Sequence, residues 1–233
     1  MSNMPNEIQE IFDKLDNEIV WLCATWAVYK DLFAHSDKRI DLLRESGEHF
    51  FYIIRGALLN NVIGVLNNLA DPAKSGKYEN CSLKQLQSLT DEQNIPQDVS
   101  RKLQDIINQL DDKCVEKSSP LRMFRDKSLN HFDLETALDK SSTPMITHET
   151  VEKCLIIIKD FMNTIKSYYD QSESAYELHK SFTFDGSNRL ISVLKDGIRY
   201  SKIRDQCNKT DISNHALMDH LVDDLFGNEF KDA

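Results

Sequence analysis

The stretch NEIQEIFDKLDNEIVWLCATW, residues 6–26, decides the fold class of this chain. Its apolar side chains recur at steps of three and four residues, as Ile8, Ile11, Phe12, Leu15, Ile19, Leu22, Cys23 and Trp26. This spacing places them on one face of an α-helix. We expect that helix to run from about residue 6 to residue 34. Trp21 and Trp26 are expected in a core or an interface rather than as a base-stacking platform.

The same periodicity continues along the chain and predicts an all-α fold. Further helices are expected at about residues 37–69, 97–117, 148–177 and 185–204, with a short helix starting at Ser82. Asp71-Pro72 ends the second helix, because proline restricts the residue before it and cannot continue a helix. Residues 73–80 are expected to form a surface loop. With no strand-like alternation of useful length, the sequence predicts an antiparallel helical bundle with extra C-terminal helices.

The core faces of the two longest later helices follow from the same periodicity. In the second helix the core face would comprise Ile40, Leu43, Phe50, Ile54, Ala57, Leu58, Val65, Leu66 and Leu69. In the helix at 148–177, which Thr147 can cap, it would comprise Val151, Leu155, Ile158, Met162, Ile165 and Tyr169.

Composition and length limit the classes of protein to consider. The chain has 233 residues with only 7 Gly and 5 Pro, which favours long helices over a turn-rich β fold. We expect one helical domain over residues 1–206 and a polar tail with one short helix over residues 207–233. No apolar run approaches the length of a membrane span, and the first residues lack a signal-peptide pattern. We therefore expect a cytoplasmic protein without a membrane partner.

Charge and cysteine content exclude several kinds of site. The net charge of −10 argues against tight nonspecific binding along a duplex, which needs a broad basic face. It leaves room for a small basic cleft, because Lys113, Lys117, Arg122, Arg125 and Lys127 fall within one short window. The five cysteines are odd in number and have no Cys-x-x-Cys spacing, so we expect free thiols rather than disulfides or a zinc site.

The segment Arg125-Asp126-Lys127-Ser128-Leu129-Asn130-His131 offers the most specific chemistry in the chain. An arginine can hold phosphate through a planar fork of donors and stays charged at ordinary pH. A histidine can accept or donate a proton near neutrality. Together these side chains suit the cleavage of a phosphodiester.

Spacing alone does not identify a site, because Arg44 and His49 satisfy the same loose rule inside a long predicted helix. Context separates the two pairs. Arg125 and His131 follow a Ser118-Ser119-Pro120 break and precede a predicted loop at residues 139–147. A junction of this kind is better suited to bringing two side chains into one cleft. The alternative for this pair is a structural arginine bonded to carbonyl groups and a capping histidine.

In this setting the segment resembles the ribonuclease signature of the HEPN superfamily. Its flanks, Phe124 to Lys127 and His131 to Asp133, are similar to the AbiU-like abortive-infection branch in particular. The segments from Phe50 to Arg55 and from Asn68 to Pro72 look like the second helix of that branch and its Asp-Pro ending. Ser82 to Leu86 look like the next, short helix of that branch. The likeness spans roughly residues 15 to 205.

The resemblance implies a metal-independent endoribonuclease without a cofactor, in which two copies of the motif meet in a homodimer. His131 would then exchange protons with the ribose 2′-hydroxyl or the leaving oxygen, and Arg125 would stabilise charge on the reacting phosphate. Asp126 would orient these groups or shape the cleft, and Lys127, Arg122 and Asn130 could hold flanking phosphate or sugar. The substrate would be single-stranded or looped RNA, and an antitoxin or other partner protein could control the activity.

Two other functions fit the sequence. Some HEPN proteins keep the fold only as a dimerising, binding or scaffold module, and the acidic charge favours this alternative. A metal-dependent enzyme could instead use His215 with Asp219 and His220 with Asp224 in the C-terminal tail, although a solvated acidic face explains these pairs equally.

Overall fold

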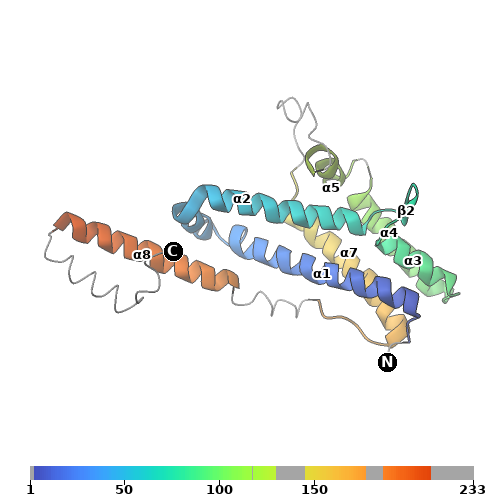
Figure 1. Cartoon of the computed structure of the whole chain (residues 1–233). Helices are drawn as coiled ribbons and strands as arrows, with labels where there is room; N and C mark the ends of the chain where they lie inside the picture. The colour runs from blue at the N-terminus through green and yellow to red at the C-terminus, as the bar shows by residue number, and fades with distance from the viewer. Residues whose placement is uncertain (1–2, 117, 130–144, 177–185, 211–233) are drawn as a thin grey trace. The chain divides into compact units, whose positions relative to one another are not determined.

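The structure is a computed structural model that describes residues 3–116, 118–129, 145–176 and 186–210 (Figure 1). The helices are α1 (Asn6–Phe33), α2 (Asp37–Leu69), α3 (Leu83–Glu92), α4 (Gln97–Cys114), α5 (Pro120–Phe124), α7 (His148–Asp170) and α8 (Gly186–Thr210). A π-helical turn, η1 (Arg125–Leu129), comes directly after α5, and two short strands, β1 (Lys74–Ser75) and β2 (Tyr78–Glu79), form a hairpin. The predicted all-α fold is confirmed.

The chain divides into two compact units. The first comprises residues 1–30 and 53–184, and the second comprises residues 31–52 and 185–233. In the second unit, Arg39 donates to the backbone carbonyl of Asp31 and to Asn188 of α8, and Lys202 pairs with Glu45 at 2.9 Å. The division into residues 1–206 and 207–233 remains a prediction.

The core of the first unit is built from the faces that the sequence periodicity predicts. α4 packs along α7, and the buried face of α7 contains Val151, Cys154, Leu155, Ile158, Phe161, Met162 and Ile165. α1 contributes Ile8, Phe12, Leu15, Ile19, Leu22 and Trp26, all at most 4 % exposed. Thr147 caps α7 and Ser82 caps α3, as expected from their hydroxyl groups.

A polar cluster fixes α1 against α7. The indole Nε1 of Trp26 donates to the Glu152 carboxylate at 2.7 Å, and Lys30 pairs with the same oxygen. The His148 ring lies edge-on to Trp26. Burial disfavours the charged form of Glu152, but hydrogen bonds from Lys30 and Trp26 outweigh it and lower the pKa of this carboxyl group. The cluster gives the buried Trp26 indole a hydrogen-bond acceptor, as such groups require.

The predicted core face of α2 is wrong in its middle. Phe50 is 62 % exposed and Ala57 is exposed, while Phe51, Val62 and Ile63 are buried instead. Gly47 adopts an extended backbone conformation inside α2, so the helical phase restarts after it. A periodicity counted through Gly47 places Phe50 rather than Phe51 in the core, although Leu66 and Leu69 are buried as predicted.

The two tryptophans and Tyr169 differ in burial. Trp26 is buried as expected. Trp21 is 72 % exposed and lies outside the core that the structure describes, and its alternative place in an interface stays a prediction. Tyr169 is only partly buried. An exposed position on an amphipathic helix tolerates an aromatic residue, so residue type alone does not place Trp21.

α2 is the one helix among the described residues that is long and apolar enough to cross a membrane, judged by length and composition alone. Its C-terminal half belongs to the core of the first unit, where Val62, Ile63, Leu66 and Leu69 are buried.

The segment after α2 differs slightly from the predicted loop, because it contains the β1–β2 hairpin with Gly76 at φ 63° in its turn. Asn80 braces this hairpin by donating from its side chain to the Pro72 carbonyl at 2.7 Å and from its backbone to Ala73 at 2.8 Å. The Asp71-Pro72 end of α2 is thereby held in place.

Core packing in α2 can be tested with a matched pair of isoleucines. Ile63 is fully buried and Ile53 is 65 % exposed on the same helix. We expect Ile63→Ala to lower the free energy of unfolding by about 2–5 kcal/mol, since it leaves a cavity. Ile53→Ala should change it by less than about 0.5 kcal/mol. Urea denaturation followed by circular dichroism measures both, and equal losses would contradict the difference in burial between the two side chains.

Candidate functional site

The arginine motif is placed by a tight connection between α4 and α5. The Ser119 hydroxyl donates to the backbone carbonyl of Lys113 in the last turn of α4 and accepts from the Arg122 backbone N–H. Pro120 occupies the first position of α5, where its missing N–H costs nothing. Leu121 is fully buried and anchors the short helix. The predicted Ser-Ser-Pro break is therefore a helix start that fixes the position of α5.

Arg125 begins the π-helical turn η1. π-helical turns are rare and occur frequently at functional sites, because they shift the direction of side chains away from those of a regular α-helix. The sequence alone predicts only the Ser118-Ser119-Pro120 break before this point. The structure thus gives Arg125 and Asp126 positions that helical periodicity does not predict.

Arg125 belongs to a chain of four charged side chains. Arg122 Nε donates to Asp126 Oδ2 at 2.6 Å, and Arg125 Nε donates to Asp126 Oδ1 at 3.2 Å. Arg125 Nη1 donates to Asp71 Oδ1, also at 3.2 Å. The order Arg122–Asp126–Arg125–Asp71 alternates in sign. It links α5 and η1 to the end of α2, and we call it the ion-pair chain.

The charge state of Asp126 follows from this arrangement. Partial burial disfavours its ionised form, but the hydrogen bonds and charges of Arg122 and Arg125 outweigh burial and lower the pKa of the Asp126 carboxyl group. Asp126 is therefore ionised at neutral pH. Its two oxygens hold two arginines, Arg122 and Arg125. The predicted role of Asp126 in orienting the site stays a prediction.

Arg125 is the least exposed member of the ion-pair chain. Its side chain is 14 % exposed, against 35 % for Asp71 and 42 % for Asp126. The charge of Arg125 acts to lower the pKa of the Cys114 thiol at the end of α4, although other causes outweigh it. Cys114 and Cys154 form a buried pair with sulfur atoms 3.9 Å apart. The hydrogen bond with Cys154 and burial raise the pKa of Cys114, so this thiol stays protonated.

Of the other predicted site residues, the structure describes some and not others. Arg122 and Lys127 are partly buried beside Arg125 and Asp126. Asn130 and His131 lie outside the described residues, as do the tail histidines His215 and His220. The predicted approach of His131 to Arg125 stays a prediction.

The chance match at Arg44 and His49 has a different environment. Arg44 is 59 % exposed and pairs along its own helix with Asp41 and Glu48. His49 is also exposed. Because Arg44 contacts only neighbours in sequence among its ion pairs, it serves as a natural control for Arg125.

Asp71 is the site residue that sequence reasoning missed. The sequence marks it only as part of the helix-ending Asp-Pro pair, yet it binds Arg125 across 54 positions of sequence. No local spacing rule connects two residues so far apart. The one signal in the sequence is the family-like Asp-Pro segment itself, which marks the position without revealing its partner.

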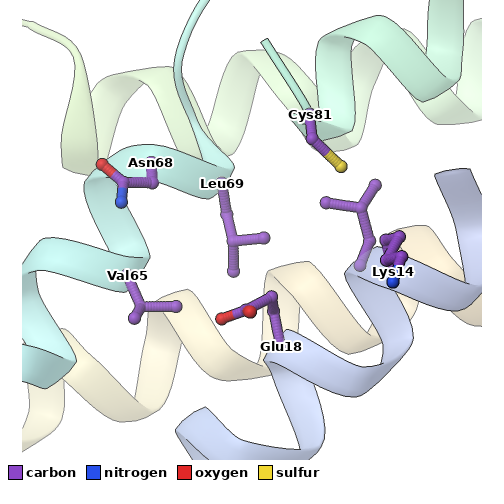
Figure 2. A pocket seen from close by; sticks show the side chains of 7 residues that line it. Lys14, Glu18, Val65, Asn68, Leu69 and Cys81 are labelled. Atoms are coloured by element: carbon purple, nitrogen blue, oxygen red, sulfur yellow. The ribbon is translucent and has the colours of Figure 1, made fainter.

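A cleft of about 430 Å³ lies in the first unit. Figure 2 shows side chains from α1, from the end of α2 and from Cys81 around it. Its lining residues are Lys14, Leu15, Glu18, Val65, Asn68, Leu69 and Cys81. A second groove of about 410 Å³ between α4 and α7 is lined by residues that include Lys113 and Lys153. Neither includes a member of the ion-pair chain.

Within the described ranges, no group of three or more His, Cys, Asp or Glu side chains is arranged to hold a metal ion. The expectation of a metal-independent site remains a prediction, because the tail histidines lie outside those ranges.

Comparison with known proteins identifies the family. The sequence profile described as AbiU2, of the HEPN class, matches residues 5–205. The chain belongs to the HEPN AbiU2 family. The matched range contains every helix of the first unit and the whole ion-pair chain, so the resemblance predicted from the sequence is confirmed. Neither the curated proteins nor the solved structures contain a significant match to the chain.

The lowered pKa of Asp126 predicts a pH-dependent contribution to stability. A carboxyl group whose pKa is lower in the folded state stabilises the fold above its ordinary value of 3.8, and this contribution is lost as pH falls through the folded value. We expect Asp126→Asn to be less stable than the natural chain near neutral pH. The difference should shrink as the pH falls below the ordinary value. Urea titrations at a series of pH values measure it, and a difference independent of pH would contradict the ion pairing.

The buried thiol pair predicts selective alkylation. Cys81 is exposed, whereas Cys114 is buried and stays protonated, and the thiolate is the reactive form. We expect iodoacetamide to modify Cys114 at least about tenfold more slowly than Cys81 in the folded protein. Peptide mass spectrometry measures both rates. Unfolding in urea should remove the difference, and equal rates in the folded protein would contradict the packing of α4 on α7.

Proposed function

We propose that this protein is a metal-independent endoribonuclease that acts as a toxin or antiphage abortive-infection effector. The observation that carries the proposal is the placement of Arg125, at the arginine of the HEPN signature, in a π-helical turn between two carboxylates. Membership of the HEPN AbiU2 family supports it. An arginine held in this way is preorganised to stabilise charge that develops on a phosphate.

The reaction that fits these groups is attack by the ribose 2′-hydroxyl on the adjacent phosphorus. His131 accepts the hydroxyl proton as the bond from O2′ to phosphorus forms, and the bond from phosphorus to the 5′ oxygen breaks. The leaving oxygen takes up a proton, supplied by His131 or its counterpart. The products are a 2′,3′-cyclic phosphate end and a 5′-hydroxyl end, and the reaction consumes no cofactor.

Single-stranded or looped RNA is the proposed substrate, since the internal nucleophile requires a 2′-hydroxyl and paired RNA is hard to read. Arg122, Lys127 and Asn130 would hold flanking phosphate or sugar. In this proposal two chains form a cytoplasmic homodimer in which both motifs line one cleft, an isologous arrangement. An antitoxin or other partner protein would control the activity.

A non-catalytic binding or scaffold function is the second candidate. The observation that favours it is the engagement of Arg125, which is 14 % exposed and paired with two carboxylates. The net charge of −10 points the same way, because it weakens general attraction to RNA. An inactive module would use Arg125 only to join α2 to η1.

Cleavage of RNA by the purified chain separates the two candidates. We expect cleavage in the presence of EDTA, with cyclic phosphate ends identified by mass spectrometry. Arg125→Ala should lower kcat by about 10²–10³-fold, the usual loss when a donor to transition-state charge is removed. His131→Ala should lower it at least as strongly, since it removes the proton-transfer group.

Arg44→Ala is the matched control, because Arg44 satisfies the same sequence spacing but lies exposed within α2. It should cleave RNA at the natural rate. Cleavage that survives in both motif variants, or that EDTA abolishes, would exclude the proposed mechanism. A natural chain that binds RNA or a partner without cutting would favour the scaffold function.

A further inference from the structure

We propose that Asp71 is a positioning residue for Arg125, and that it sets the rate of RNA cleavage rather than the affinity for RNA. This inference rests on the proposed ribonuclease function. It concerns a residue outside the arginine–histidine motif, located 54 positions earlier at the end of α2.

The two carboxylates that bind Arg125, those of Asp126 and Asp71, restrain it in different ways. Asp126 is the next residue in the chain, so its contact with Arg125 Nε moves with η1 and cannot fix η1 in space. Asp71 binds Nη1 from another segment. Two hydrogen bonds at different nitrogens of a planar guanidinium group fix the orientation of its plane. Asp71 therefore supplies the external reference for that orientation.

Asp71 is itself held firmly enough to serve as a reference. Its backbone N–H donates to the Asn68 carbonyl at 3.3 Å, and Pro72 restricts its backbone conformation. The Pro72 carbonyl accepts from the Asn80 side chain at 2.7 Å, which ties this residue to the hairpin. Restraints thus act on both sides of the Asp71 carboxylate.

The exposure and the charge of Asp71 indicate that it orients Arg125 rather than stabilising the whole fold. The Asp71 side chain is 35 % exposed, and Arg125, which is 14 % exposed, keeps a second carboxylate partner in Asp126, so loss of Asp71 should cost little stability. The ion-pair chain contains two arginines and two carboxylates, so its formal charges cancel. Removing the Asp71 charge leaves a net positive cluster, which attracts RNA no less than before. Loss of Asp71 should therefore leave substrate binding intact and misplace the guanidinium.

The two bonds to carboxylates engage two of the five N–H donors of an arginine. A phosphate can be contacted by donors outside these two bonds. The arrangement thus orients Arg125 without consuming its whole donor capacity, as a positioning contact requires.

Steady-state cleavage of a fluorescent single-stranded RNA oligonucleotide tests the proposal on the full chain. We expect Asp71→Ala to lower kcat on the order of 10²-fold, the loss expected from a misplaced group, with KM unchanged or lower. Asp71→Asn retains an acceptor oxygen and should recover part of this loss. In an Arg125→Ala background, Asp71→Ala should cause no further loss, because its effect passes through Arg125.

Asp111→Ala is the matched control. Asp111 forms an interhelical pair with Lys84 at 2.7 Å, with an exposed fraction of 32 %. The ion pairs that the structure gives for Arg125 are with Asp71 and Asp126. It should keep the natural kcat, and thermal unfolding of all variants should show that each is folded.

The possible outcomes distinguish the two proposals. Natural kcat in Asp71→Ala, together with loss of cleavage in Arg125→Ala, would overturn the positioning inference and leave the ribonuclease intact. A rise in KM at constant kcat, or an additional loss in the Arg125→Ala background, would also overturn it. A natural chain that does not cleave RNA would overturn the proposed function and this inference with it.

Discussion

The ion pair between Arg125 and Asp71 is the contact on which the arrangement of the candidate site depends. It joins the end of α2 to the π-helical turn after α5, two segments far apart in sequence. Restraints converge on it from both sides: Ser119 fixes the start of α5, and Asn80 fixes the residue after Asp71. Without this pair, neither segment would define where Arg125 points. The pair matters for geometry more than for stability, because Asp71 is 35 % exposed and solvent screens its charge.

The same contact explains why two functions remain compatible with one fold. An arginine bound by carboxylates is held in place, and the carboxylates partly offset its charge. For a ribonuclease this is preorganisation, since a group already oriented needs no rearrangement as charge develops on the phosphate. For a scaffold it is a structural link and nothing more. Membership of the HEPN AbiU2 family is common to both functions, so the decision rests on what Arg125 does to a bound phosphate.

Helical periodicity predicts the helices well because the buried faces of α1 and α7 are continuous. Periodicity fails where a kink changes the helical phase, and where the contact partner of a residue lies far away in the sequence. Gly47 shifts the phase of α2, which exposes Phe50 and buries Phe51, and a periodic count cannot detect an extended residue inside a helix. The segment Arg125–His131 stands out through residue chemistry and family-like flanks. Asp71 does not stand out in the sequence. Its contact with Arg125 spans 54 positions and depends on how the helices pack, which no local pattern encodes.

Expression of the natural chain in cells, beside Arg125→Ala and His131→Ala, tests whether the protein cleaves RNA through these two side chains. Growth and the integrity of cellular RNA are measured together, with protein levels matched by immunoblotting. A ribonuclease whose activity depends on Arg125 should arrest growth and fragment RNA only in the natural form. Intact RNA in cells that express the natural chain with its controlling partner absent, or fragmentation that persists in both variants, would contradict the account.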